Sequence, residues 1–179
     1  LEPLAEYIKS HNKLDYPDIE LETEAEKYIS EEKGVANIEE AINGASDIIA
    51  EEISERAEFR AWIRNYLHKE GVFVSKLKKE FAEGTTKYEM YRSFEAPVAD
   101  IKPHNMLALR RGETEKVLTF DLKFDEDYVL QYLEKFILLA DKPNIVGFYR
   151  NAIKDAFDRL MKHSLIGEVR LAKKNIADE

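Results

Sequence analysis

The chain is poor in the residues that form crosslinks or interrupt helices. It contains no cysteine, which excludes disulfide bonds and thiolate metal sites and favours a reducing compartment such as the cytoplasm. Seven glycines and five prolines in 179 residues leave few positions at which a helix must end. No apolar run approaches the roughly 20 residues that a transmembrane helix requires, so we expect no membrane partner.

The patterns that hold cofactors and metals are also missing. Neither GxGxxG nor GxxxxGK[ST] occurs, so no nucleotide cofactor is expected. The histidines are far apart in the sequence and lack the close spacing of zinc ligands. They are His11, His68, His104 and His163. We therefore predict no cofactor and no metal.

Two short patterns resemble catalytic or ion-binding motifs. Ser75 and Lys78 have the Ser-x-x-Lys spacing of acylating serines, but the companion motifs of that chemistry are absent. Asp121, Asp125 and Asp127 lack the intervening glycine and the following glutamate of a calcium loop. The acids at 125 and 127 are better explained by the start of a helix, where negative charge is favourable. We predict no catalytic residues, and hence no enzyme.

What is present is a mixture of apolar and charged residues. The chain is 44% hydrophobic and 35% charged, which suits a folded, helix-rich protein with a real core. Its formal net charge of −9 repels nucleic acid at long range. Any contact with nucleic acid must therefore use a local basic patch or other domains.

Apolar periodicity predicts the fold. Residues 45–70 repeat apolar side chains at helical spacing, with a break near Ser54–Ala57, and residues 144–174 form a long amphipathic helix. Residues 116–124 alternate as a strand does, and residues 72–77 are the nearest candidate partner. We predict a mainly α fold: an irregular multi-helix assembly with a small central β element of one or two short strands and a long C-terminal helix.

The same patterns suggest three parts along the chain. Residues 1–70 are helical, residues 71–124 mix loop, short helix and strand, and residues 125–179 are helical again. The stretch 82–97 has the composition of loop and turn. Because both ends fall inside helical patterns, we expect a fragment of a larger multidomain protein.

The segment "HNMLALRRGETEKVLTF", residues 104–120, carries the candidate binding residues. Pro103 suits the first turn of a helix that runs to Arg111 and stops at Gly112. Arg110 and Arg111 point about 100° apart on a helix. We expect one to pair with a nearby glutamate, Glu113 or Glu115, and the other to remain available for a phosphate.

This segment resembles the signature of the bacterial Tex family of transcription accessory proteins, Pro-Ser-His-Arg-x-Leu-Ala-x-x-Arg-Gly-Glu-x-Glu-x-x-Leu. The matching residues are His104, Leu107, Ala108, Arg111, Gly112 and Glu113, and Pro103 corresponds to the proline but stands one place before the histidine. "LEPLAEYI", "GASDIIAEEISERAEFRAWIRNYLHKEGVFVSK" and "RNAIKDAFDRLMKHSLIGEVR" resemble further family segments, in order, over nearly the whole chain. The sequence departs from the pattern at Asn105, where the family has arginine.

The resemblance implies a transcription-associated protein that binds nucleic acid. Tex proteins combine an N-terminal helical region, a YqgF domain of RNase H-like fold, helix-hairpin-helix motifs and a C-terminal RNA-binding OB-fold domain. By this resemblance the chain is the helical segment before the YqgF domain. The domains best known for contacting nucleic acid lie outside it.

Two functional hypotheses follow. The first is a non-enzymatic scaffold of a Tex-like protein that reaches nucleic acid through other domains and has the transcription machinery as a further partner. In it, His104, Arg110 and Arg111 contact nucleic acid or a neighbouring domain. The alternative is an acidic helical module that docks a basic partner or another domain of its own chain.

Overall fold

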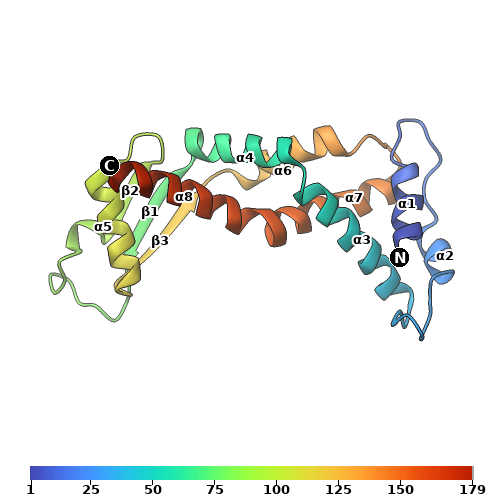
Figure 1. Ribbon diagram of the computed structural model, residues 1–179, viewed down its shortest axis with the longest axis horizontal. Helices are drawn as coiled ribbons and strands as arrows, with labels where there is room; N and C mark the ends of the chain where they lie inside the picture. The colour runs from blue at the N-terminus through green and yellow to red at the C-terminus, as the bar shows by residue number, and fades with distance from the viewer. Residues whose placement is uncertain (179) are drawn as a thin grey trace. The chain divides into compact units, whose positions relative to one another are not determined.

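The computed structural model describes residues 1–178 and shows a mainly helical protein with one small sheet (Figure 1). This confirms the predicted fold class, including the long C-terminal helix. The helices are α1 (Glu2–Ser10), α2 (Leu21–Glu26), α3 (Ile38–Ser54), α4 (Ala57–Glu70), α5 (Pro103–Thr114), α6 (Glu126–Ile137), α7 (Pro143–Asp155) and α8 (Lys162–Asp178). A π-helical segment (Ala156–Met161) joins α7 to α8, a 3-10 turn covers Glu89–Tyr91, and the strands are β1 (Val72–Leu77), β2 (Ser93–Pro97) and β3 (Leu118–Lys123). None of the helices within residues 1–178 combines the length and apolar character needed to cross a bilayer.

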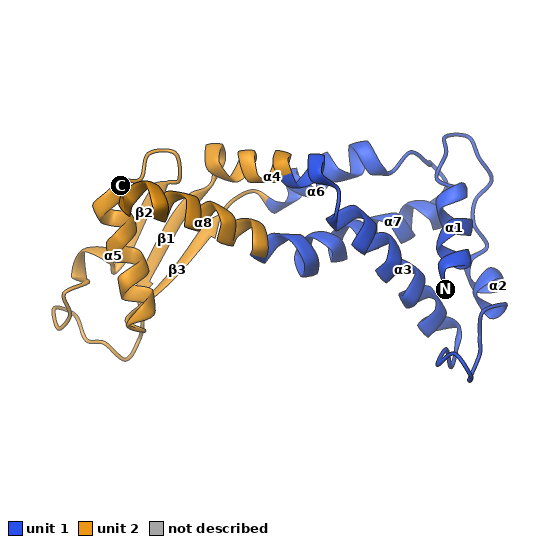
Figure 2. Cartoon of the chain, viewed as in Figure 1, with its two compact units in different colours: residues 1–60, 126–163 blue, residues 61–125, 164–179 orange. Residues whose placement is uncertain are grey.

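The chain divides into two compact units (Figure 2). Unit 1 comprises residues 1–60 and 126–163, and unit 2 comprises residues 61–125 and 164–179. In unit 1, α3 packs against α1, α2, α7 and the π-helical segment, and its alanines and isoleucines form the buried face. The side chain of Asn37 caps α3 by accepting a hydrogen bond from the backbone N–H of Glu40 at 2.9 Å.

Hydrogen bonds between distant parts of the sequence hold the N-terminal segment of unit 1 in place. The Asp18 carboxylate accepts bonds from the backbone N–H groups of Asn144 and Ile145, both at 3.0 Å, and so satisfies the first turn of α7. Burial acts in the opposite direction, but these backbone donors hold the pKa of Asp18 below its usual value. The Asn12 amide likewise accepts a bond from the N–H of Leu139 at 2.8 Å.

The sheet of unit 2 is antiparallel with strand order β2-β1-β3. Strand β1 pairs with β3 as the alternating patterns predicted, and Ser75 faces Phe120 across the pair. Strand β2 was not predicted, because residues 82–97 were expected to be loop and turn. Ser93–Pro97 is a short edge strand with half-buried and exposed residues in alternation, and such a strand gains its partner only in the folded chain.

Helix α5 does not stop at Gly112, as the sequence had suggested. It continues to Thr114 and ends in a left-handed residue, Lys116, with a φ angle of 64°. The N–H of Val117 bonds to the carbonyl of Gly112 at 2.9 Å and that of Lys116 to Glu113 at 3.0 Å, which is a Schellman end. Gly112 has a packing role instead. A Cβ atom there would lie 2.4 Å from Cδ1 of Leu118, so only glycine lets β3 approach the helix this closely.

We predict that two glycine-to-alanine changes in helices have opposite effects. Gly112→Ala should lower the free energy of unfolding by about 1–3 kcal/mol, because the methyl group overlaps Leu118. Gly147→Ala should raise it by about 1 kcal/mol, because a Cβ there meets nothing within 4 Å and alanine favours the helix. Urea denaturation followed by circular dichroism measures both, and changes of the same sign would contradict the packing role of Gly112.

A second prediction concerns the end of α5. Lys116→Gly should be about 0.5–1 kcal/mol more stable than Lys116→Ala, because glycine adopts a positive φ without the Cβ penalty. Both variants remove the same charge, so their difference isolates the backbone. Equal midpoints in thermal and urea denaturation would show that the left-handed conformation carries no cost here.

Candidate nucleic-acid interface

All three residues expected to contact nucleic acid lie on α5, but they do not share one face. Asn105, Met106, Leu109 and Gly112 form the buried side of the helix. His104 and Arg111 are seven residues apart, so they lie on one exposed face about 10 Å apart along the axis. Arg110 is turned about 100° from Arg111 and is half-buried at the edge of the packed side.

Neither arginine forms the expected pair with a glutamate. Within residues 1–178, the side chains of Arg110 and Arg111 have no hydrogen bond or ion pair. Glu115 instead pairs with Lys87 at 3.2 Å and accepts a hydrogen bond from the Tyr88 hydroxyl. The prediction that one of the two arginines would be held internally is therefore wrong, and both cations remain available.

The remaining glutamate is taken by an arginine from the C-terminal helix. Arg170 of α8 pairs with Glu113, and its guanidinium lies over the Phe120 ring at 4.2 Å from the centroid. Its side chain is only 18% exposed, so it is better placed than the exposed Arg111 to hold this carboxylate. The pairing joins α8 to α5 across 57 residues of sequence, a distance over which local patterns give no signal.

The N-terminal end of α5 borders a shallow pocket of about 310 Å³. Lys102, His104, Asn105 and the half-buried Phe94 contribute to its wall. No side chain caps the first turn of α5, which leaves its N–H groups open to an acceptor. Asn105 is 6% exposed, and its Oδ1 atom has no hydrogen-bond partner within the described residues. The pocket thus offers N–H donors, a cation, an aromatic surface and an unused acceptor, and the carboxylate of Asp100 also lies in its wall.

A second group of cations lies where α4 and α8 meet in unit 2. Burial, followed by the charges of Lys173 and Arg64, holds the pKa of His68 below its usual value. An ion pair between Arg64 of α4 and Glu168 of α8 at 2.7 Å joins the two helices, and Lys173 belongs to the same α8. Sequence reasoning missed Lys173, although its basic neighbourhood "AKKN" was a visible signal. Since α8 also contacts α5 through Arg170, cations line three neighbouring helices of unit 2.

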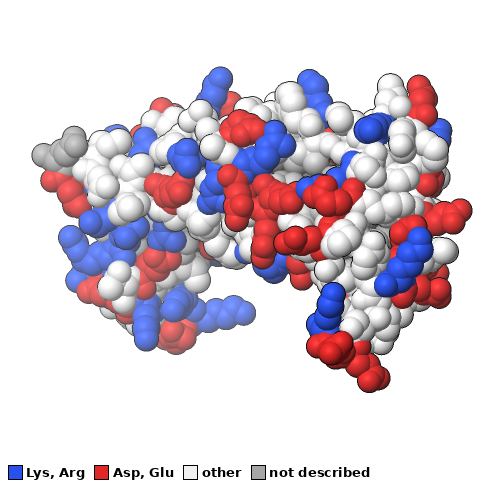
Figure 3. Space-filling view, turned by 45° about the vertical axis from the view of Figure 1, so that its right-hand side comes forward, with Lys and Arg blue, Asp and Glu red and all other residues white. Residues whose placement is uncertain are grey.

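The two units differ sharply in charge. Unit 1 has 12 Lys and Arg against 23 Asp and Glu, a formal charge of −11, whereas unit 2 has 15 against 13, a formal charge of +2. Figure 3 shows Lys and Arg gathered over the part of the chain that holds α5 and the sheet. The net value of −9 therefore hides an acidic unit and a weakly basic one.

Ion pairing sharpens this difference. Eight of the 12 cations of unit 1 form ion pairs with its carboxylates. In unit 2 five of 15 do so within residues 1–178. The other ten are Lys69, Lys76, Lys78, Lys79, Lys102, Arg110, Arg111, Lys116, Lys123 and Lys173. Among the described residues, unit 2 thus has the larger share of cations without an ion pair, and these are free to meet phosphates.

The structure bears on the two short patterns that resemble catalytic and ion-binding motifs. Ser75 is 3% exposed, and its hydroxyl donates to the carbonyl of Tyr91 at 2.7 Å, so it is not free to act as a nucleophile. Among residues 1–178, no three His, Asp or Glu side chains gather as metal ligands would, and this includes Asp121, Asp125 and Asp127.

Comparison with known proteins identifies the family. Fold and charge define a mainly helical protein with an acidic unit and a cationic one, and residues 16–156 match the family described as Tex central region-like. The chain therefore belongs to the Tex family, as its resemblance to the family signature had indicated.

Similar proteins come from bacteria and from humans. The chain is 38% identical, over its full length, to the uncharacterised protein YdcI of Bacillus subtilis, of which it covers 24%. It is 28% identical over 71% of its length to the transcriptional accessory protein Tex of Neisseria gonorrhoeae, of which it covers 16%. It is 25% identical over 77% of its length to the human S1 RNA-binding domain-containing protein 1, of which it covers 15%. The chain thus spans a quarter or less of these relatives.

The geometry predicts which arginine stabilises the fold. Arg170→Ala should lower the free energy of unfolding by about 1–2 kcal/mol, because it removes the contact with the Phe120 ring and leaves Glu113 unpaired. Arg110→Ala and Arg111→Ala remove the same charge without losing a partner, so each should change stability by less than about 0.5 kcal/mol. Equal losses in all three variants, measured by urea denaturation, would contradict this assignment.

Proposed function

We propose that this chain is a non-enzymatic helical scaffold within a cytoplasmic transcription accessory protein, and that unit 2 supplies an auxiliary contact to nucleic acid. Family membership supports the setting, since one relative is named as a transcriptional accessory protein and another as an S1 RNA-binding domain-containing protein. In this proposal the main nucleic-acid contacts belong to other domains of the full-length protein.

The auxiliary contact rests on the ten cations of unit 2 that have no ion pair within residues 1–178. Lysine and arginine bind phosphates mainly by releasing counterions, so cations not already neutralised by carboxylates contribute most. Arg110 and Arg111 are two of these cations on α5, and the exposed His104 lies on the same face of the helix as Arg111. The pocket at the start of α5 adds N–H donors of the kind that bind phosphate oxygens.

The negative charge of unit 1 explains why this contact is auxiliary. Unit 1 carries −11, so the chain as a whole repels a polyanion before the cations of unit 2 can engage it. Binding by this chain should therefore be weak and strongly dependent on salt. Stronger binding requires domains with more favourable charge, which fits the role of a scaffold that holds them.

The absence of a catalytic role is likewise part of the proposal. Its support is the chemistry of the side chains: the Ser75 hydroxyl is bonded to a backbone carbonyl inside the sheet. Arg110 and Arg111 lie near the C-terminal end of α5, and guanidinium groups keep their protons near neutral pH, which suits binding better than proton transfer.

Fluorescence anisotropy with a labelled single-stranded RNA and a DNA duplex tests the contact. We expect dissociation constants weaker than about 1 µM at about 0.15 M salt, because the contact is nonspecific and opposed by unit 1. The double variant Arg110→Ala/Arg111→Ala should bind more weakly still. It should also reduce the slope of log K against log salt by about 1–2, one for each lost phosphate contact.

A matched control removes the same charge from unit 1. Arg150 and Arg159 are paired with Glu134 and Asp155, so Arg150→Ala/Arg159→Ala should leave the salt slope unchanged. An unchanged slope in the α5 variant would rule out the auxiliary contact. Submicromolar binding that survives high salt would contradict the scaffold role, because the chain would then be a principal nucleic-acid-binding element.

A further inference from the structure

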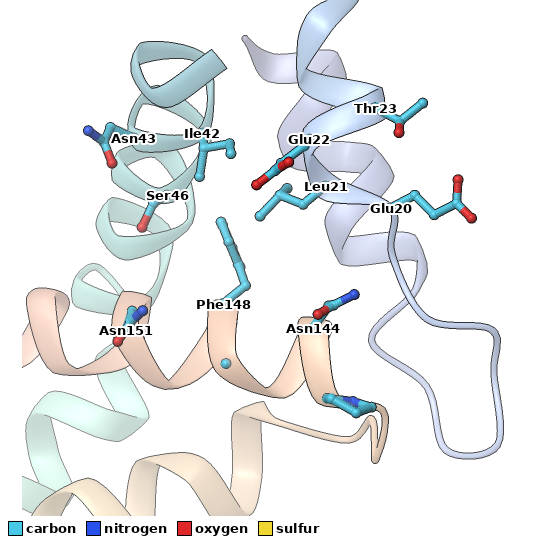
Figure 4. Close-up of a pocket in the computed structure, with 12 residues that line it drawn as sticks. Glu20, Leu21, Glu22, Thr23, Ile42, Asn43, Ser46, Asn144, Phe148 and Asn151 are labelled. Carbon is cyan, nitrogen blue, oxygen red and sulfur yellow. The ribbon is translucent and has the colours of Figure 1, made fainter.

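A groove of about 550 Å³ lies within unit 1 between α2, α3 and α7 (Figure 4). Leu21, Ile42 and Phe148 come from these three helices and face the interior of the groove, and Phe148 is 7% exposed. Gly147 adds no side chain to α7 at this point, and a Cβ there would meet nothing within 4 Å. The groove therefore has an apolar floor and remains open between its helical walls.

The polar groups around this floor are acidic or neutral. Glu22 points into the groove from α2, and neither it nor Ser46 and Asn151 has a side-chain partner within residues 1–178. Glu20 also belongs to the wall, although Figure 4 shows its side chain directed away from the gap. Among the residues that the structure describes, no lysine, arginine or histidine lines the groove. An occupant would thus meet a negative field, hydrogen-bonding rims and an apolar centre.

We propose that this groove docks a cationic amphipathic peptide segment of a partner protein. Charge complementarity favours this occupant. The groove has a carboxylate and no cation, and it belongs to a unit whose formal charge is −11. Apolar side chains of the segment lie on Leu21, Ile42 and Phe148, and a lysine or arginine beside them meets Glu22. An open groove with helical walls suits an elongated segment whose anchors repeat along one face.

This inference is independent of the proposed contact with nucleic acid. It concerns unit 1 and carboxylates, whereas that contact concerns unit 2 and cations. It does rest on the alternative hypothesis of an acidic interaction module. It locates the docking site of that module in the groove and identifies the partner as a cationic amphipathic segment. A nucleic acid would be repelled by the same groove, so the two ligands are distinguishable.

Titration of the 179-residue chain with labelled synthetic peptides of equal length tests the proposal. The probes are a Leu/Lys amphipathic peptide, its Leu/Glu counterpart and a Ser/Lys peptide of the same positive charge. We expect the Leu/Lys peptide to bind with a dissociation constant on the order of 10 µM. The other two should bind at least about tenfold more weakly, because each lacks one of the two complementary features.

Two variants address the groove itself. Glu22→Lys reverses the inward charge, and Gly147→Lys places a cationic side chain over the apolar floor at a position that accepts a Cβ. Each should weaken binding of the Leu/Lys peptide at least about tenfold. Because lysine favours a helix more than glycine does, Gly147→Lys should remain folded in circular dichroism, which keeps the test interpretable.

The controls match these changes one for one. Glu55→Lys makes the same charge reversal at the exposed C-terminal end of α3, nine or more residues beyond the groove, and should leave affinity unchanged. Gly147→Ala changes the helix without adding charge and should bind within about twofold of the parent. Equal binding of the Leu/Glu peptide, or equal loss in Glu55→Lys and Glu22→Lys, would overturn the proposal. So would absence of binding by the Leu/Lys peptide at millimolar concentration.

Discussion

The close approach of β3 to α5 determines how unit 2 presents its charges. Leu118 packs where Gly112 has no side chain, and the same side of α5 buries Met106 and Leu109. Once that side is fixed, helical geometry leaves His104 and Arg111 facing outward. The exposure of these two side chains is therefore a consequence of core packing, and it does not depend on any interaction that they make themselves.

Ion pairing then decides which cations can act at a distance. A lysine or arginine already beside a carboxylate has little charge left to attract a phosphate, even though an exposed pair adds little to stability. Most cations of unit 1 are in this state, whereas Arg110 and Arg111 of unit 2 are not. Arg170 pairs with Glu113, the glutamate that an arginine of α5 was expected to hold, and within residues 1–178 neither Arg110 nor Arg111 has another carboxylate partner.

Much of the fold could be predicted because it depends on local patterns. The strands at 72–77 and 118–123 and the break between α3 and α4 follow from alternation, helical spacing and capping residues. Strand β2 and the pairing of Arg170 with Glu113 could not be predicted, since both depend on partners distant in sequence. The predicted end of α5 at Gly112 was wrong for a related reason. A glycine near the end of a helical pattern resembles a stop signal, and its packing role depends on Leu118, which only the folded chain brings against it. For the site, the sequence located α5 and its cations but could not tell which of them would be paired.

An acidic unit and a cationic unit in one chain give the protein a physical basis for selectivity. The charge of unit 1 opposes nonspecific binding to any polyanion, so in the proposed function the cations of unit 2 contribute only when another domain has already brought nucleic acid close. The same negative charge favours approach of a cationic peptide segment to the groove beside Phe148. Long-range electrostatics can therefore distinguish two ligands of opposite charge before either makes a specific contact. A scaffold of this kind can bind both ligands, because they do not compete for the same site.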